Sequence, residues 1–144
     1  MEAWEVGARE AIRDTLARYV HLVDRGRLDE ATSLFAEDAT LEVGDGRTAT
    51  GRAAVRALFA RTGERLAAGG RRPFIRHHLS SITVSVEDAE TATAESYFLA
   101  LGEHGPDHWG RYRDRLVRRQ GRWVFAERRV RVDGRVPGSL LGAD

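Results

Sequence analysis

The spacing of apolar residues changes part-way along this chain, and the change limits the folds available to it. From residue 9 to residue 66, apolar side chains recur about every 3.6 positions, as on the buried face of a helix. From residue 74 to residue 132, apolar and polar residues tend to alternate, as in strands that bury one face. The sequence therefore predicts helices first and a sheet second, which is an α+β fold.

Three helices and one short strand are expected in the first half of the chain. The first helix covers residues 9–24, whose apolar side chains share one stripe, and a shorter helix follows over residues 28–35. A short strand is expected over residues 38–43. The third helix covers residues 52–68 and ends at a pair of glycines.

Four longer strands are expected in the second half, over residues 74–86, 91–101, 110–119 and 122–132. Two of their three links are short enough for hairpins, so the sheet should be largely antiparallel. The link around residues 105–107 reads as a longer loop. A sheet that curls over the helices would enclose a cavity at its concave face.

The chain is expected to form one domain over residues 1–144, with loosely ordered tails at 1–8 and 134–144. No apolar run approaches the ~18 residues of a membrane-spanning helix, and the charged N-terminus differs from an export signal. The absence of cysteine fits a reducing compartment. We therefore expect a cytoplasmic protein without a membrane partner.

The charged residues argue against several classes of function. All 23 basic residues are arginine. Without lysine, the chain has no amine for a Schiff base and none for a phosphate-binding loop. The 22 acidic residues leave a formal net charge of +1, whereas nucleic-acid-binding domains usually carry a clustered positive excess. We expect no nucleic-acid partner.

Short motifs in a fixed order span most of residues 9–132. They are RYVHLVDRGRLD at 18–29, LFAEDAT at 34–40, GR at 51–52, RH at 76–77, TATA at 91–94, YF at 97–98, GRY at 110–112 and GRW at 121–123. Together they resemble SnoaL-like proteins of the nuclear-transport-factor-2-like superfamily. The resemblance implies a cone-shaped α+β barrel, in which N-terminal helices pack on a strongly curved, mostly antiparallel sheet that encloses a pocket.

The resemblance also implies a reactive pair, Asp24 and His77. Their positions resemble those of the pair in scytalone dehydratase and lindane dehydrochlorinase, where a histidine takes a proton and an aspartate orients it. Asp24 lies one turn after Val20 on the apolar stripe, and His77 lies on the more polar face of its strand. His78 takes this place if the register slips by one residue. The residues alone also allow a solvated Asp24 and a His77 that hydrogen-bonds within the core.

Other candidates follow from the same stripe and alternation. Tyr19 shares the stripe and is either an oxyanion donor or a plain core residue. Tyr112 and Asp114 alternate with arginines that are costly to bury, so they should face inward, with Asp114 as a second acid. The residues expected in catalysis are His77, Asp24, Tyr19 and Asp114, and those expected to contact substrate are Tyr112, Tyr97, Phe59, Arg118 and Arg128.

Two mechanisms of the superfamily do not carry over. The proton-shuttling aspartate of ketosteroid isomerase would fall on Val43. The second histidine of scytalone dehydratase would fall within residues 97–101, which contain none. His104 and His108, with Asp107, are readable as metal ligands or as parts of a loop, and we expect neither a metal nor another cofactor.

The function expected from the resemblance is a cofactor-independent lyase or isomerase, of the dehydratase, cyclase or isomerase type, acting on a hydrophobic oxygenated small molecule such as a polyketide. One alternative is a non-catalytic binder or an accessory subunit resembling the β-subunit of ring-hydroxylating dioxygenases, in which Asp24 and His77 lie apart. Another is an epoxide hydrolase that activates water with Asp24, Asp114 and Arg118 or Arg128. Families like this one often form homodimers, so we expect a homodimer.

Overall fold

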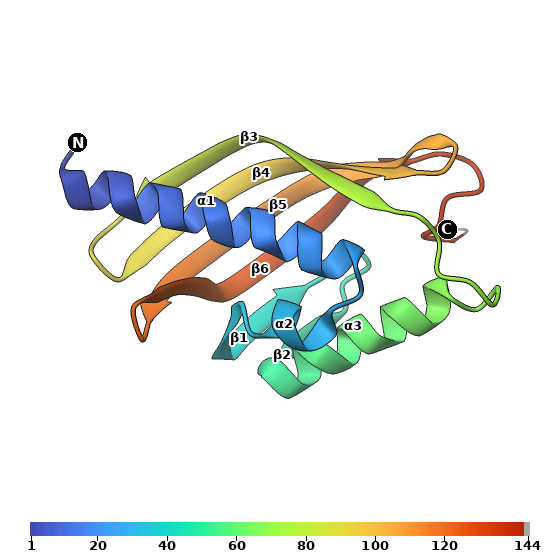
Figure 1. Ribbon diagram of the computed structural model, residues 1–144, viewed down its shortest axis with the longest axis horizontal. Coiled ribbons are helices and arrows are strands. Elements are labelled where there is room, and N and C mark those ends of the chain that lie inside the picture. The colour runs from blue at the N-terminus through green and yellow to red at the C-terminus, as the bar shows by residue number, and fades with distance from the viewer. Residues whose placement is uncertain (143–144) are drawn as a thin grey trace.

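The computed structural model describes residues 1–142, with helices before a long sheet (Figure 1). The elements are α1 (Ala3–Asp24), α2 (Leu28–Thr32), β1 (Phe35–Glu42), β2 (Thr48–Thr50), α3 (Arg52–Leu66), β3 (Arg76–Val86), β4 (Thr91–Gly102), β5 (Gly105–Arg119) and β6 (Arg122–Arg135). Six strands form one sheet in the order β2-β1-β6-β5-β4-β3. Within it, β1 and β6 are parallel and the other neighbours are antiparallel. The expected α+β class is confirmed.

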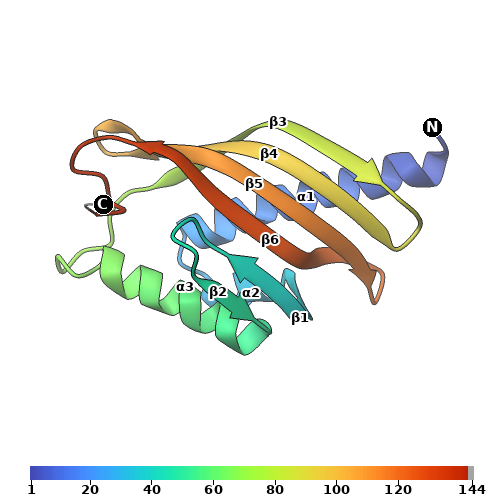
Figure 2. The same ribbon diagram turned by 180° about the vertical axis from the view of Figure 1, so that it is seen from behind.

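The helices lie against different parts of the curved, unclosed sheet. Helix α1 runs along one face of β3–β6, and α3 lies beside β1 and β2 (Figures 1 and 2). Ile12 and Leu16 of α1 are fully buried in one apolar cluster with Phe35 and Phe125 of the sheet. Burying a side chain of this size contributes roughly 1.5–3 kcal/mol. Of the described helices, none is long and apolar enough to cross a bilayer.

Strand β3 changes the face that it buries half-way along its length. His77 and Leu79 face inward as the alternation predicts, but the pairing with β4 shifts between Ser80 and Thr83. Ser81 there has a φ of 51°. Because a bulge adds an unpaired residue, the inward positions after it are the apolar Ile82, Val84 and Val86. The expectation that Ser81, Thr83 and Ser85 face the interior is therefore wrong.

Both ends of the chain, and the link at residues 105–107, are more ordered than the sequence suggests. Residues 3–8, expected as part of a loose tail, belong to α1. Residues 105–107, expected as a loop, begin β5. Strand β6 continues to Arg135, and residues 136–142 turn back to contact Asp107. Residues 143–144 of the expected tail lie outside the described residues.

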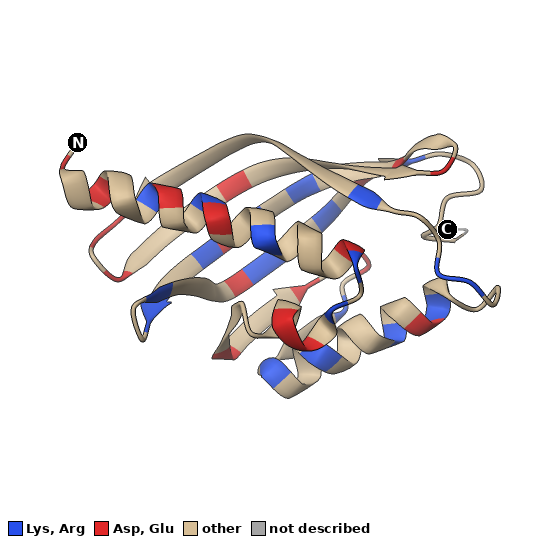
Figure 3. Ribbon diagram, viewed as in Figure 1, with Lys and Arg blue, Asp and Glu red and all other residues tan. Residues whose placement is uncertain are grey.

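Charged residues of both signs are interspersed along the strands (Figure 3), and many of them, such as Glu95, Arg113 and Arg129, are exposed on the outer face of the sheet. Arg113 Nε lies 3.5 Å from Glu95 Oε1, and Arg129 Nε lies 2.7 Å from Glu127 Oε1. These exposed pairs contribute at most about 1 kcal/mol each to stability. The arginines of this face are solvated or paired with acids, as expected.

Arg128 and Asp114 form an ion pair that is completely buried between β5 and β6. Arg128 Nε lies 2.9 Å and Nη2 3.2 Å from the two carboxylate oxygens, and neither side chain is exposed. The guanidinium carbon lies 3.7 Å from the ring centre of Tyr112 and 4.2 Å from that of Tyr19. Burial raises the pKa of Asp114, and the charge of Arg128 opposes that shift. The pair therefore joins the sheet to the aromatic floor of the interior.

Replacing one member of this pair should be costly. In Arg128→Met, the carboxylate of Asp114 loses its partner inside the protein, so the free energy of unfolding should fall by about 3–5 kcal/mol. Urea denaturation measures this free energy of unfolding. The matched variant Arg129→Met, on the same strand, loses only an exposed ion pair and should change the value by less than about 1 kcal/mol. Equal effects in the two variants would contradict this role.

Candidate functional site

A cavity of about 550 Å³ lies between α1, α3 and the sheet. Much of its wall is apolar, including Val23, Leu58, Phe59 and Phe98. Its polar wall includes His77, His108, Tyr19, Tyr112, Arg47, Arg65, Arg72 and Arg135. A mostly apolar cavity with a few placed polar groups is typical of a small-molecule site.

Asp24 and His77 meet at the wall of this cavity. The final residue of α1 is Asp24, and His77 is the second residue of β3. His77 Nδ1 lies 2.5 Å from Asp24 Oδ1, and the His77 backbone N–H donates to Asp24 Oδ2 at 2.9 Å. In the neutral ring, this arrangement keeps the hydrogen on Nδ1 and leaves Nε2 as the proton acceptor.

Arg72 holds the end of α1 in place, a role that the sequence reading missed. Its Nη2 donates to the carbonyl oxygens of Val23 and Asp24, at 2.8 Å each. A cation at this end of a helix offsets the helix dipole and satisfies carbonyls that have no partner within the helix. Gly26 follows with a φ of +69°, and a Cβ there would lie 1.5 Å from Arg72 Nη1. The glycine thus provides both the turn and the space.

A second carboxylate–imidazole pair, Asp107 and His108, lies close to the first. His108 Nδ1 lies 2.7 Å from Asp107 Oδ2, and the ring centres of His108 and His77 are 6.0 Å apart. Burial lowers the pKa of His108, and Asp107 opposes this shift only in part. The sequence suggested for these residues only a role as metal ligands or as parts of a loop. Neighbours in a strand normally face opposite sides, but the β4–β5 register shifts between Ala100 and Leu101, and both are buried.

Aromatic side chains from three elements complete the floor. Tyr19, Tyr112 and Phe59 line the cavity as expected, with the rings of Tyr19 and Tyr112 6.1 Å apart and nearly perpendicular. Burial raises the pKa of both tyrosines, so both hydroxyls stay protonated at neutral pH. Each hydroxyl therefore keeps a hydrogen that it can donate in a hydrogen bond.

Several predicted positions lie outside the cavity. Tyr97 is 55% exposed because it alternates with the inward Phe98, and His78 is exposed for the same reason. Arg118 is exposed because the alternation of β5 ends at Leu116, after which the neighbouring Val117 is buried and Arg118 faces solvent near the end of the strand. Neither residue lines the cavity, so the prediction that Tyr97 and Arg118 contact substrate is wrong.

The remaining polar candidates occupy different environments. Asp114 and Arg128 face inward as expected, but they lie beneath the tyrosines and do not line the cavity. His104 is exposed at the β4–β5 turn. Within residues 1–142, no three His, Asp or Glu side chains gather in a way that would hold a metal ion.

Residues 4–129 match the model of the SnoaL-like domain. The chain belongs to the SnoaL-like domain family. No curated protein matches it.

Solved structures share the fold of this SnoaL-like domain. A candidate scytalone dehydratase from Novosphingobium aromaticivorans is 24% identical, with a TM-score of 0.81 over 94% of this chain and 91% of that one. An NTF2-like protein with a cystatin-like fold, also from Novosphingobium aromaticivorans, is 30% identical, with a TM-score of 0.77 over 96% and 91%. A protein from Catenulispora acidiphila in complex with S-DNPA is 24% identical, with a TM-score of 0.77 over 89% and 95%.

The lowered pKa of His108 predicts a pH dependence of stability. The folded state binds a proton at His108 less readily than the unfolded chain, whose pKa is near 6.5. The resulting contribution to stability is present above pH 6.5 and is lost as the pH falls from there toward the folded-state pKa. Urea denaturation between pH 8 and pH 5 should show that His108→Gln loses less stability on acidification than the unsubstituted protein. Parallel pH profiles would contradict the assignment.

Proposed function

We propose that this SnoaL-like domain is a cofactor-independent lyase or isomerase that moves a proton on a hydrophobic, oxygenated small molecule. The observation that carries the proposal is the 2.5 Å contact between His77 Nδ1 and Asp24 Oδ1 at the wall of a mostly apolar cavity. A carboxylate on one ring nitrogen fixes the tautomer and increases the basicity of the other nitrogen. The proposal further places the domain in the cytoplasm as a homodimer.

In the proposed reaction, His77 Nε2 takes a proton from a carbon next to a carbonyl or beside a leaving group. The electron pair of the broken C–H bond moves into an enolate or a new double bond. The negative charge of Asp24 stabilises the imidazolium that forms. In an elimination the leaving group departs with the electron pair of its bond to carbon, and a departing hydroxyl takes the proton of the imidazolium and leaves as water. In an isomerisation the imidazolium returns its proton to another carbon. The hydroxyls of Tyr19 and Tyr112 donate to the oxygen on which charge develops.

The alternatives have less support. A non-catalytic binder predicts that Asp24 and His77 lie apart, yet two hydrogen bonds join them. An epoxide hydrolase of the expected kind needs Asp114 and an arginine around a water in the cavity, whereas Asp114 is occupied by Arg128 beneath the tyrosines. Elimination is also favoured by the structural likeness to the candidate scytalone dehydratase.

Removing the base should abolish most of the turnover. A panel of cyclic β-hydroxyketones and β,γ-unsaturated ketones is incubated with the protein, and the conjugated products are followed by absorbance. In His77→Ala, kcat should fall by about two to four orders of magnitude, since general base catalysis contributes this much. Loss of the α-hydrogen to D2O, followed by NMR, should slow in parallel.

The neighbouring His78 provides the matched control. Because this side chain is exposed on the opposite face of β3, His78→Ala should keep the activity of the unsubstituted protein. Circular dichroism checks that both variants are folded. Undiminished turnover in a folded His77→Ala protein would exclude His77 as the base.

A further inference from the structure

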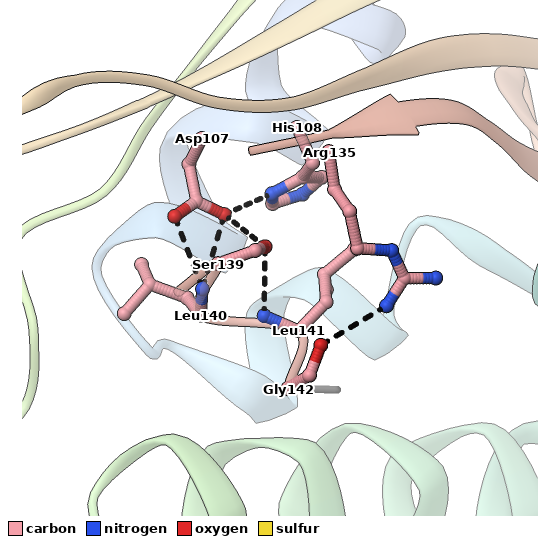
Figure 4. Close-up of polar contacts among 7 residues, drawn as sticks. All are labelled: Asp107, His108, Arg135, Ser139, Leu140, Leu141 and Gly142. Carbon is pink, nitrogen blue, oxygen red and sulfur yellow. Dashed lines mark hydrogen bonds and ion pairs between the residues drawn. The ribbon is translucent and has the colours of Figure 1, made fainter. Parts of the chain in front are cut away.

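The carboxylate of Asp107 holds two parts of the molecule at once (Figure 4). On one side, Oδ2 accepts a hydrogen bond from His108 Nδ1 at 2.7 Å. On the other side, Ser139 Oγ donates to Oδ2 at 2.7 Å, and the Leu140 N–H lies 3.0 Å from Oδ1 and 3.2 Å from Oδ2. Burial raises the pKa of Asp107, but the hydrogen bonds from His108, Ser139 and Leu140 outweigh burial and lower it. The carboxylate is thus an ionised acceptor shared by a cavity residue and by the C-terminal segment.

The C-terminal segment, residues 136–142, forms part of the cavity wall through these bonds. The Val136 N–H donates to the Asp107 carbonyl at 3.0 Å, and the Leu141 N–H donates to Ser139 Oγ at 3.1 Å. Leu140 and Leu141, which this turn holds in place, both line the cavity. The wall and the orientation of His108 therefore depend on one carboxylate.

The imidazole ring of His108 presents a hydrogen-bond acceptor to the cavity and not a proton donor. Its ring lines the cavity beside His77 and 5.9 Å from the ring centre of Phe98. Because burial lowers its pKa, the ring is neutral near pH 7. Asp107 accepts only from the Nδ1 hydrogen, so Nε2 is left as a hydrogen-bond acceptor. Such an acceptor suits a hydroxyl group and disfavours a ligand that lacks one, since a buried acceptor without a partner is costly.

We propose that His108 determines specificity by accepting a hydrogen bond from a ligand hydroxyl at Nε2, and that Asp107 is the positioning residue that links this acceptor to docking of the C-terminal segment. The inference rests on the proposed function and names its substrate class: an apolar molecule with a hydroxyl close to the carbon that gives its proton to His77. The 6.0 Å between the two ring centres allows one small ligand to contact both.

Binding of two matched probes tests the proposal without any turnover. β-Naphthol can donate a hydrogen bond, whereas its methyl ether cannot. Calorimetry should show that the unsubstituted protein binds the naphthol about five- to tenfold more tightly than the ether, the effect of one net hydrogen bond. His108→Phe should remove this preference, and His104→Phe, at the exposed turn, should keep it. Equal affinities in the unsubstituted protein, or a preference that survives His108→Phe, would overturn the proposal.

Nitrogen-15 NMR of the imidazole rings tests the role of Asp107. The unsubstituted protein should show the His108 hydrogen on Nδ1, and a hydrogen on Nε2 would overturn the proposal even if no variant folds. In Asp107→Asn, the side-chain amide donates to Nδ1, so the hydrogen should move to Nε2 and the preference for naphthol should disappear. An unchanged tautomer in this variant would show that Asp107 does not orient the ring.

Ser139→Ala tests the link to the C-terminal segment. Hydrogen exchange at Leu140 and Leu141 should accelerate about five- to tenfold, since a buried hydrogen bond is lost. The preference for naphthol should fall in the same variant, and an unchanged preference despite faster exchange would break the proposed link. These binding measurements are independent of the turnover of His77→Ala, so the specificity proposal and the proposed reaction can fail separately.

Discussion

The buried pair of Arg128 and Asp114 is the constraint around which the interior is organised. Two opposite charges cannot remain inside a protein unless each satisfies the other, and neighbouring positions on β5 and β6 bring them together. The guanidinium then provides a flat cationic surface on which Tyr19 and Tyr112 pack. These rings form the floor of the cavity, so the position of the floor follows from the ion pair.

The polar groups of the cavity depend on irregularities in the sheet. In β3, a bulge lets the strand present His77 at one end and an apolar face to the core at the other. In β5, a register shift buries Asp107 and His108 together. Both irregularities disturb ladder pairing, and both place an imidazole in the cavity with a carboxylate on Nδ1. A regular sheet of the same sequence would turn part of this set toward solvent.

The SnoaL-like fold permits many reactions, so the side chains of the cavity carry the functional argument. Val43, the position expected by resemblance to correspond to the aspartate of ketosteroid isomerase, lines the cavity as an apolar residue. Strand β4, where a second histidine would be expected by resemblance to scytalone dehydratase, has Ala100 opposite His77, and His108 reaches the cavity instead from β5. The arrangement of two carboxylate-bound histidines thus differs from both of those patterns.

The sequence by itself determined that helices precede the long strands, because this order follows from apolar periodicity. The family motifs favoured an inward Asp24 and His77 over His78, but the residues alone left both choices open. Tertiary structure decided the rest. Arg118 and Tyr97 face outward, Asp107 reaches Ser139 and Leu140, and the N-terminal residues join α1. Strand alternation can be read from the sequence only while neighbouring strands stay in register. Bulges, and contacts between residues some thirty positions apart, are fixed by packing between distant segments.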